Sequence, residues 1–386
     1  MKNNRTFLEK LLDGAEVEWK PLMDLAEIGT GNSNRQDEEE NGKYPFYVRS
    51  KNILRSNSFQ FDETAIIIPG EGGIGDIFHY VEGKYALHQR AYRIHITSDK
   101  VNTKFLYYIM HNSFKKYILS KSVGATAISI RKPMLEKFEI PIPPLSVQTE
   151  IVKILDALTA LTSELTSELI LRQKQYEYYR EKLLSEEELG KVGFEWKTID
   201  EISKKISSGG TPTTSNNGYY DNGTIPWLRT QEVDFKEIWD TNIKITEDAL
   251  NNSSAKWIPA NCVIVAMYGA TVGKTAINKI PLTTNQACAN IEINDKLACY
   301  RYIFHYLTSK YEYIKSLGSG SQTNINAQII KKLKVPVPPI EEQQRIVSIL
   351  DKFETLTNSI TEGLPLAIEQ SQKRYEYYRE LLLNFS

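Results

Sequence analysis

The sequence is poor in the residues that most often build metal sites and disulfide frameworks. It has three cysteines, Cys262, Cys288 and Cys299, and five histidines in 386 residues. The cysteines are odd in number and lack CxxC spacing, so they predict neither a disulfide framework nor a zinc site. We expect buried free thiols, and we expect no metal or other cofactor in this chain.

Signatures of nucleotide binding and of catalysis are also missing. The segment 269–275 (GATVGKT) has three residues between its first glycine and the Gly-Lys pair, where a phosphate-binding P-loop needs four. The chain has no GxSxG motif and no Asn/Asp-Pro-Pro-aromatic motif of an amino-methyltransferase. The tripeptides at 18–20 and 195–197 (both EWK) resemble the end of a nuclease motif, but their position at a repeated domain start favours a structural role. We therefore expect a chain that is not an enzyme.

Long apolar runs are absent too. No stretch approaches the roughly 18 apolar residues of a membrane span, and the first residues lack a basic segment leading into an apolar run. We expect a cytoplasmic protein with no membrane partner. Its 41% apolar and 25% charged content is typical of a globular chain, and its length suggests two or three domains.

What the sequence does contain is a strong internal repeat. Segment 140–156 (IPIPPLSVQTEIVKILD) aligns with 335–351 (VPVPPIEEQQRIVSILD) with nine identities in 17 positions, at an offset of 195. Further on, 173–181 (QKQYEYYRE) aligns with 372–380 (QKRYEYYRE) at an offset of 199, so the second copy holds four extra residues. A repeat of this length predicts two structurally related halves.

The duplication reaches the chain ends. EVEWKPL (16–22) resembles GFEWKTI (193–199), and FLEKLL (7–12) resembles YREKLL (179–184). The N-terminal segment therefore looks like the end of a helix whose beginning lies elsewhere. Its natural partner is the C-terminal helix, so we expect a circular, pseudo-twofold molecule with neighbouring termini.

Each repeat opens a long helix. After Pro143-Pro144 and Pro338-Pro339, apolar residues recur in steps of three and four for about 40 residues, roughly 60 Å of helix. A lone helix of this length cannot bury its apolar stripe, so the two should pack antiparallel as a coiled coil. Gly363 and Pro365 should kink or briefly break the second helix, and the four extra residues should act as a stutter. The predicted contact stripe contains Leu155, Leu158, Leu165, Tyr176, Tyr179, Leu350, Phe353, Tyr375 and Tyr378.

Two diverged domains lie between the helices. Short β-type runs such as 65–68 and 262–265 precede glycine-rich turns, and a helical stretch (104–119 or 299–316) precedes each repeat. The fold class is therefore α/β (mixed α+β). We expect a distal helical segment at 1–19, a first domain at 20–140, a central spacer helix at 141–196, a second domain at 197–335 and a C-terminal spacer helix at 336–386.

Corresponding features recur in the two domains despite their divergence. We align residues 45–49 with 226–229, Gly75 with Gly273, and Gln89 with Gln286. Segments 124–130 and 319–325 form a further matching pair. The helices are similar and the domains are not, as expected if two different sequences are read by domains on equivalent spacers.

Charge is distributed unevenly although the formal net charge is −1. Residues 20–140 carry 17 Lys and Arg against 14 Asp and Glu, and residues 197–335 carry 16 against 12. The helical regions 141–196 and 336–386 carry 6 against 10 and 5 against 8. The position of charge, rather than its sum, governs nucleic-acid binding, so the two domains are the candidates for contacting DNA.

The PIPPLxxQxxIVxxLD segment, the tandem LTSE (161–168), the EGLP segment (362–365), both QKxYEYYRE blocks and SGGTPT (208–213) followed by IPWLR together resemble the specificity subunits of type I restriction-modification systems. The resemblance covers nearly the whole chain. It implies that each domain is a target-recognition domain for one half of a bipartite double-stranded DNA sequence. It also implies that the helices set the spacing and bind two methyltransferase subunits, which carry S-adenosylmethionine, and that a restriction (motor and nuclease) subunit can join.

Candidate DNA-contacting side chains lie beside turns and β-type runs in both domains. Arginine pairs well with guanine, and asparagine or glutamine with adenine, in the major groove. A turn that points Lys274 at a phosphate is a further expectation. The candidates are Arg49, Lys51, Arg55, Gln89 and Arg90 in the first domain, and Ser208, Thr211, Arg229, Lys274, Asn285 and Gln286 in the second.

Two alternatives stay open at this point. The chain could be a DNA-modifying enzyme with an unrecognised site, or a coiled-coil scaffold whose domains bind proteins. Turnover by the isolated chain would indicate the first, and absence of salt-dependent DNA binding would indicate the second.

Overall fold

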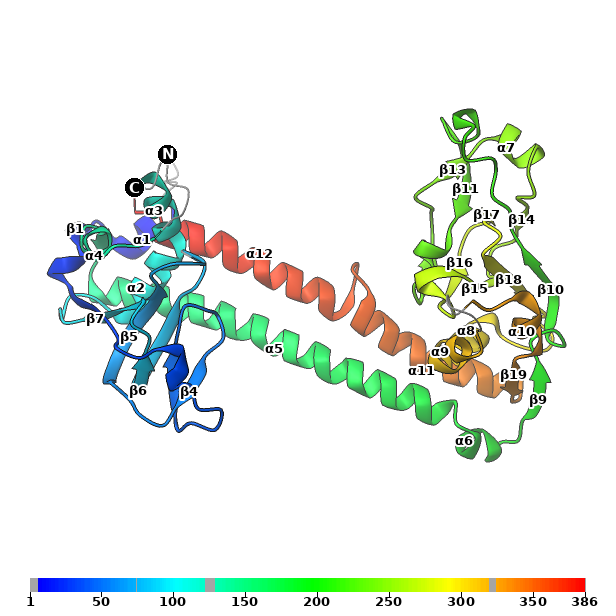
Figure 1. Ribbon diagram of the computed structural model, residues 1–386, viewed down its shortest axis with the longest axis horizontal. Helices are drawn as coiled ribbons and strands as arrows, with labels where there is room; N and C mark the ends of the chain where they lie inside the picture. Colours follow the sequence, from blue (N-terminus) through cyan, green and yellow to red (C-terminus); the bar gives the residue numbers. More distant parts are fainter. Residues whose placement is uncertain (1–5, 74, 122–128, 319–323, 386) are drawn as a thin grey trace. The chain divides into compact units, whose positions relative to one another are not determined.

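The computed structural model describes residues 6–73, 75–121, 129–318 and 324–385. The chain divides into two compact units, residues 1–166 with 367–386 and residues 167–366 (Figure 1). Each unit contains one α/β domain together with parts of the long helices. The expected mixed α/β class, with two repeated domains and long helices, is confirmed.

The first unit is built on a six-stranded sheet. Its strand order is β2-β7-β5-β6-β3-β4, in which only the β3–β6 pair is parallel. The helical stretch expected at 104–119 forms α2 (Thr103–Ile109), a π-helical turn at Met110–Phe114, and α3 (Lys115–Lys121), and α4 (Lys132–Glu136) follows. The strands are β2 (Ala26–Thr30), β3 (Tyr44–Tyr47), β4 (Leu54–Ser56), β5 (Phe61–Pro69), β6 (His79–Leu87) and β7 (Ala91–Ile96).

The uninterrupted apolar run in β5 is explained by burial on both faces of this sheet. Ile66 and Ile68 point into a core that includes the helices, and Ala65 and Ile67 point into a smaller core on the opposite face. Successive side chains of a strand alternate between faces, so a strand covered on both sides shows no polar alternation.

The second unit repeats this plan with its sheet divided in two. A five-stranded sheet has the order β10-β18-β15-β16-β12, and a four-stranded sheet has the order β13-β11-β17-β14. Residues 279–281 separate β16 from β17, which together correspond to the single strand β6. The strands are β10 (Ser203–Ser208), β11 (Ile225–Leu228), β12 (Lys236–Ile238), β13 (Lys244–Ile245), β14 (Trp257–Ile258), β15 (Val263–Ala266), β16 (Thr275–Asn278), β17 (Leu282–Thr284) and β18 (Cys288–Ile293).

The helices of the second domain also match expectation. The stretch predicted at 299–316 forms α8 (Tyr300–Ser309) and α9 (Tyr311–Ser316). Two short helices, α7 (Glu247–Asn251) and α10 (Ala327–Lys332), complete the domain. Most of the paired segments 124–130 and 319–325 lies outside the described residues.

The repeated EWK segments form the base of each domain. β1 (Glu18–Pro21) pairs antiparallel with β8 (Glu139–Ile142), and β9 (Glu195–Thr198) pairs antiparallel with β19 (Lys334–Val337). In both copies, a strand that starts the domain is therefore bonded to the strand that leads into a long helix. A structural role for the EWK segments follows from these pairings.

The long helices begin where the prolines predict. α5 (Leu145–Leu183) starts directly after Pro144 and is 39 residues long. The second copy is two helices, α11 (Ile340–Asn358) and α12 (Gly363–Leu383). The predicted break is confirmed, but the predicted stutter is wrong, because four residues, 359–362, leave the helix instead of adding a turn to it.

Each unit contains an antiparallel helix pair. In the first, Thr162 on α5 hydrogen-bonds Ser371 on α12, and Tyr375 and Tyr378 pack on the core that contains Leu155. In the second, the rings of Tyr176 and Tyr179 stack on Phe353 at centroid distances of 6.3 and 5.5 Å, and Leu350 is fully buried. Leu158 and Leu165 are only half-buried.

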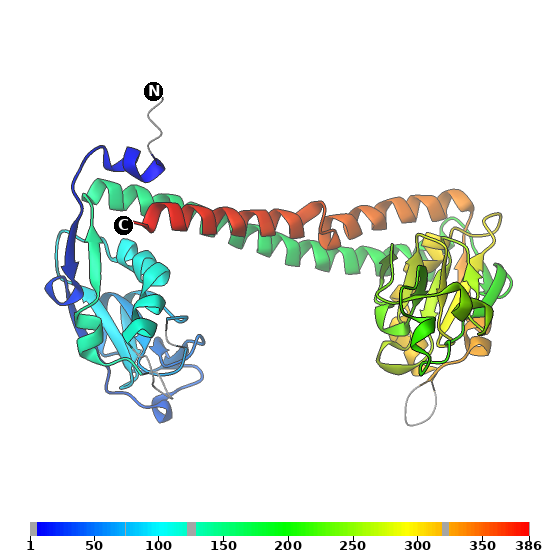
Figure 2. The same cartoon turned by 90° about the horizontal axis from the view of Figure 1, so that it is seen from above.

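The first helix of the chain contacts the last. α1 (Phe7–Leu12) places the Phe7 ring 6.5 Å from that of Tyr378, and Leu8 shares a core with Leu382 (Figure 2). However, α1 has its own N-cap, Thr6, as α6 (Glu186–Gly190) has Ser185. The comparison with residues 179–184 was therefore wrong: α1 corresponds to α6, the short helix between a long helix and an EWK strand.

None of the helices in the described part of the chain combines the length and the apolarity of a membrane span.

Candidate nucleic-acid interface

A repeated backbone arrangement presents Gln89 and Gln286. A Cβ added to Gly31 would lie 1.8 Å from the carbonyl oxygen of Leu87, and one added to Gly209 would lie 1.8 Å from that of Thr284. Only glycine permits these approaches, so the chain after β2 or β10 is pressed against the turn that follows β6 or β17. That turn carries the exposed glutamine in both domains.

Each glutamine is held by a neighbour from the glycine segment. Gln89 Nε2 donates to Asn34 Oδ1 at 2.6 Å, and Thr211 Oγ1 donates to Gln286 Oε1. A carboxamide has two donor hydrogens and two acceptor lone pairs, so each glutamine keeps groups free for a base edge. The structure thus brings Thr211 and Gln286 together, and it supplies Asn34, which the sequence did not single out.

In the first domain, two arginines share one carboxylate. Arg49 lies 3.3 Å and Arg90 3.0 Å from Glu71, and all three side chains are more than two-fifths exposed. Beside them, burial and then the charges of both arginines lower the pKa of His88, so its neutral Nδ1 accepts the Arg90 backbone N–H at 3.0 Å. Glu71 therefore holds two guanidinium groups near each other, one of them on Arg90, the residue after Gln89.

The remaining two candidates of the first domain are less closely placed. Lys51 is exposed two residues after Arg49 in the chain. Arg55 lies on the edge strand β4 opposite Pro45, whereas Arg49 lies beyond the end of β3 at Tyr47. The structure does not bring Arg55 to the glutamine turn.

In the second domain, two candidate residues have buried polar atoms without partners. Arg229 Nε and Asn285 Oδ1 are both buried and accept or donate no hydrogen bond within the described chain. They are neighbours, because Asn285 N donates to Leu228 O at 3.0 Å. An unpaired buried polar atom costs about 1–3 kcal/mol, so these two atoms lower the stability of this segment as it stands.

The register corrects one comparison made from the sequence. His88 N donates to Tyr47 O just as Asn285 N donates to Leu228 O. Arg229 therefore corresponds to Val48, and Arg49 lies one position further along. The two arginines are not equivalent, so the two domains differ at the side chains nearest to their glutamines. Ser208, at the exposed end of β10, leads directly into Gly209.

Lys274 does not point freely outward. Its ammonium lies 2.6 Å from Asp234 Oδ1 and over the ring of Phe235, and its side chain is 25% exposed. The expectation of an open phosphate contact at this turn was incomplete, because sequence spacing gave no sign of Asp234, which lies 40 positions earlier. The turn itself packs on the Arg229 segment, since Thr271 Oγ1 donates to Thr230 O at 2.8 Å.

The sequence features that imitate catalytic motifs do not form sites. Segment 269–275 runs through a single 3₁₀ turn into a strand, without the helix that a P-loop precedes. Burial raises the pKa of both the Cys262 and Cys288 thiols to about 12, which leaves them protonated and unreactive. Cys299 is half-buried, and all three are free thiols.

A buried glutamine joins each domain to its long helix. Gln148 Oε1 accepts from Asn102 N, and its Nε2 donates to Pro143 O, both at 2.8 Å. Gln343 makes the same bonds to Cys299 N and Pro338 O at 2.8 Å. Both glutamines are fully buried. They are the glutamines of the repeated PPxxxQ segment, a signal that was visible in the sequence but was not assigned a role.

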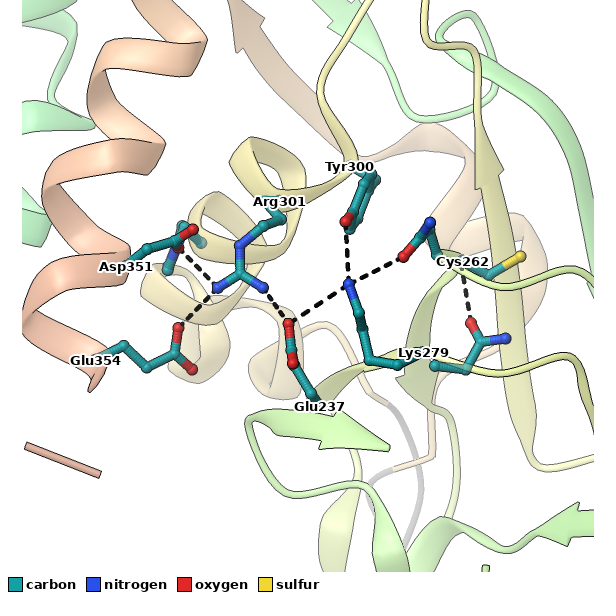
Figure 3. Close-up of polar contacts among 10 residues, drawn as sticks. Glu237, Cys262, Lys279, Tyr300, Arg301, Asp351 and Glu354 are labelled. Atoms are coloured by element: carbon teal, nitrogen blue, oxygen red, sulfur yellow. Dashed lines mark hydrogen bonds and ion pairs between the residues drawn. The ribbon is translucent and has the colours of Figure 1, made fainter. Parts of the chain in front are cut away.

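A second contact fixes the second domain on α11. Arg301, at the start of α8, reaches Glu237 on β12, Asp351 at 2.7 Å and Glu354 at 3.1 Å (Figure 3). Burial tends to raise the pKa of Asp351, but hydrogen bonds from His305 and Arg301 outweigh it and lower that pKa. Burial also raises the pKa of Glu354, and there it prevails.

His305, Asp351 and Glu354 could in principle hold a metal ion, because their ligand atoms lie within 4.8 Å of one another. The Arg301 guanidinium, however, bonds to both carboxylates. A cation would have to displace it, so these residues fit a structural ion-pair cluster better than a metal site.

The first unit has a weaker version of the same contact. Lys104 and Tyr108 on α2 reach Asp156 on α5 at 2.9 and 2.5 Å. Because the glutamine joints align Asn102 with Cys299, Lys104 corresponds to Arg301 and Tyr108 to His305. The repeated aspartate closing the ILD segment is thus the acceptor in both units.

The long helices leave part of their apolar surface uncovered. Tyr178 and Tyr377, equivalent residues of the two YEYY blocks, are 57% and 62% exposed. On α5, Ile170 and Leu171 are also about half exposed. This surface was missed because the sequence analysis assigned the apolar stripe to helix–helix contact alone.

Comparison with known proteins gives a consistent result. A family model described as the type I restriction modification DNA specificity domain matches residues 15–172 and again 191–370. A proposed type I restriction enzyme specificity subunit of Haemophilus influenzae is 40% identical over the full length of both chains. The EcoR124I/EcoR124II specificity subunit of Escherichia coli is 36% identical, over 98% of this chain and 97% of its own.

Solved structures share the fold. The crystal structure of the type I restriction-modification S subunit from M. genitalium matches with a TM-score of 0.59 at 17% identity, covering 99% of this chain and 96% of that one. The HsdS subunit of Thermoanaerobacter tengcongensis matches with a TM-score of 0.52 at 16% identity, covering 96% and 95%. With its two matched domains and its full-length relatives, the chain belongs to the family of type I restriction-modification DNA specificity subunits.

Proposed function

We propose that the chain reads DNA for a type I restriction-modification complex and catalyses no reaction itself, with each domain reading one half of a bipartite target. The observation that carries this proposal is the repeated glutamine turn, whose backbone is conserved between the domains while its neighbours differ. Gln89 stands beside Arg49 and Arg90, whereas Gln286 stands beside Arg229 and Asn285. Equivalent frames with different side chains are what reading two different half-sites requires.

The side chains support a division of roles. Gln89, Gln286, Arg229 and Asn285 would contact base edges, because their free donors and acceptors suit the major groove. Arg49 and Arg90, oriented by Glu71, would contact guanine or flanking phosphate. Ser208, Thr211, Lys51, Arg55 and Lys274 would position the backbone of the duplex.

The partners we propose are two methyltransferase subunits, which would bring S-adenosylmethionine, and in a restriction complex the motor and nuclease subunits. The exposed apolar side chains of the long helices, including Tyr178 and Tyr377, support docking there. One solved structure that shares the fold comes from work on assembly of the type I restriction-modification system. We also propose a cytoplasmic location and helices that set the spacing between half-sites.

A domain exchange tests the proposal. Residues 20–140 are replaced by the corresponding domain of a relative, the chain is assembled with its methyltransferase subunits, and methylated sites are mapped. We expect one half-site to change and the other to persist. A change in both halves, or methylation by the isolated chain, would contradict modular reading by a non-catalytic subunit.

A further inference from the structure

The second unit contains a groove that neither the proposed DNA surface nor the exposed helix surface uses. Trp196 on β9 forms one wall, Tyr306 on α8 and Ile314 on α9 form the floor, and Lys332 at the end of α10 lies opposite. Its volume is about 880 Å³. All its lining residues lie between positions 196 and 334, so it belongs to this unit alone. We call it the Trp196 groove.

The groove combines a buried apolar floor with exposed aromatic side chains. Leu307 and Ile314 are each 1% exposed, whereas Trp196 and Tyr313 are 44% and 59% exposed. Large aromatic side chains beside an apolar hollow are the usual anchors of a protein-binding surface. A binding segment would need apolar side chains to cover this floor.

The charged residues that line this floor are all basic. Lys310, Lys332 and Lys334 line the groove, and no carboxylate does. In the part of the chain that the structure describes, none of the three forms an ion pair with a carboxylate, whereas Lys331, next in the chain, pairs with Asp200 at 3.2 Å. These three lysines favour binding of a segment that carries negative charge.

The equivalent groove of the first unit is different in both respects. It is lined by Trp19, and the chain's own C-terminal residues through Phe385 also line it. Its Lys116 and Arg379 face Glu139 and Glu380 in the same lining. The first groove is thus lined in part by the C-terminal residues and is balanced in charge, whereas lysines are the charged residues that line the second.

We propose that the Trp196 groove binds an acidic segment with large apolar side chains from a methyltransferase subunit. This inference rests on the proposed function. A nucleic-acid phosphate would pair with the lysines but leave the apolar floor exposed to water, whereas a protein segment covers both. Because the first groove differs, one methyltransferase subunit is held by this contact and the other is not.

Charge reversal tests the groove. The full chain carrying Lys332→Glu and Lys334→Glu is titrated with the methyltransferase subunit, beside a control carrying Lys205→Glu and Lys296→Glu, two exposed lysines outside the lining. We expect about a tenfold weaker association of one of the two methyltransferase subunits in the groove variant, with stronger salt dependence in the wild type. We expect no change in the control. Equal affinities for all three chains would overturn the inference.

A second measurement tests the inference even if the Lys332→Glu, Lys334→Glu variant folds poorly. A photoreactive amino acid replaces the exposed Tyr313 in the assembled complex with DNA, and the cross-linked peptide is identified. A cross-link to an acidic, apolar segment of the methyltransferase subunit supports the inference. A cross-link to DNA, or none to the methyltransferase subunit, overturns it. Failure of the wild-type chain to bind any methyltransferase subunit would instead contradict the proposed function.

Discussion

The ion-pair cluster around Arg301 makes a sharp prediction about stability. Arg301 is 17% exposed and faces three carboxylates that are 19–31% exposed, on Glu237, Asp351 and Glu354. Arg301→Met keeps much of the aliphatic stem but removes the guanidinium. Asp351 then keeps His305 and Glu237 keeps Lys279, while Glu354 loses its one ion-pair partner among the described residues. Removing one partner of a buried ion pair costs about 3–5 kcal/mol, so we expect a loss of that size in the second unit.

The first unit supplies the matched control. Lys104 occupies the equivalent position, but it and Asp156 are 36% and 37% exposed, and solvent screens a pair of this kind. Lys104→Met should therefore cost no more than about 1 kcal/mol. The same chemical change at equivalent sites separates the effect of burial from the effect of losing a cation.

Thermal unfolding combined with hydrogen exchange measures the difference. For a unit of 150–250 residues, 1 kcal/mol shifts Tm by about 2–4 °C, so Arg301→Met should lower the transition of the second unit by on the order of 10 °C. Faster exchange should appear in α8 and α11 and not in α2. Equal losses in the two variants, or a loss confined to the first unit, would refute the reasoning.

The remaining predictions concern the ion-pair cluster, the candidate DNA contacts and the long helices. Asp351→Asn should destabilise the chain near pH 7, with the loss shrinking as pH falls below about 4, because the folded pKa of Asp351 is lowered. Glu354→Gln should stabilise the chain increasingly as pH rises above about 4, because the folded pKa of Glu354 is raised and ionisation of its carboxyl is unfavourable. Thermal melts against pH check both signs. In the wild-type chain Asp234 neutralises the Lys274 ammonium, so Lys274→Ala alone should have little effect on DNA binding. In a chain that carries Asp234→Asn, Lys274→Ala should clearly weaken binding to all DNA sequences. Salt-dependent binding by the wild type, the two single variants and the double variant decides this. Gln286→Ala in the assembled complex should cost about 1–3 kcal/mol at one position of one half-site, and uniform loss across sequences would make the residue structural. A further Leu-Thr-Ser-Glu after Glu168 should lengthen the spacer by one or two base pairs with both half-sites unchanged in methylation mapping, because four residues add about 6 Å but nearly complete a turn.

Periodicity and proline positions carried most of the fold. The starts of α5 and α11, the strands at β5 and β15, and the helices α2 and α8 were predictable, because apolar period and proline geometry act locally. Local pattern also explains the errors. A local pattern cannot distinguish a four-residue insertion that continues a helix from one that forms a loop between two helices. The loop here depends on the backbone conformation at the start of α12, where Gly363 has a positive φ, and the apolar pattern does not reveal that conformation.

The sequence predicted which residues are candidates for the DNA interface, but it did not predict their hydrogen-bond and ion-pair partners. Gln89 and Gln286 were found because the repeat aligns them. Their partners Asn34 and Thr211, the Glu71 carboxylate between two arginines and the Asp234 partner of Lys274 all depend on contacts across 19–75 positions. The ion-pair cluster at Arg301 could not be predicted for the same reason, although Asp156 and Asp351 both end a repeated segment of the sequence.

The buried glutamines that join each domain to its long helix, Gln148 and Gln343, bear on how such proteins acquire new DNA targets. The side-chain hydrogen bonds of Gln148 and Gln343 all go to main-chain groups. These are the N–H of Asn102 or Cys299 and the carbonyl of a proline, and for Gln148 also the carbonyl of Lys100. Since every residue but proline offers that N–H, these hydrogen bonds do not depend on the side chains of the domain. A foreign domain exchanged at crossovers inside the helical segments would therefore keep the glutamine hydrogen bonds, whereas the ion pairs with Asp156 and Asp351 would depend on the side chains of the new domain.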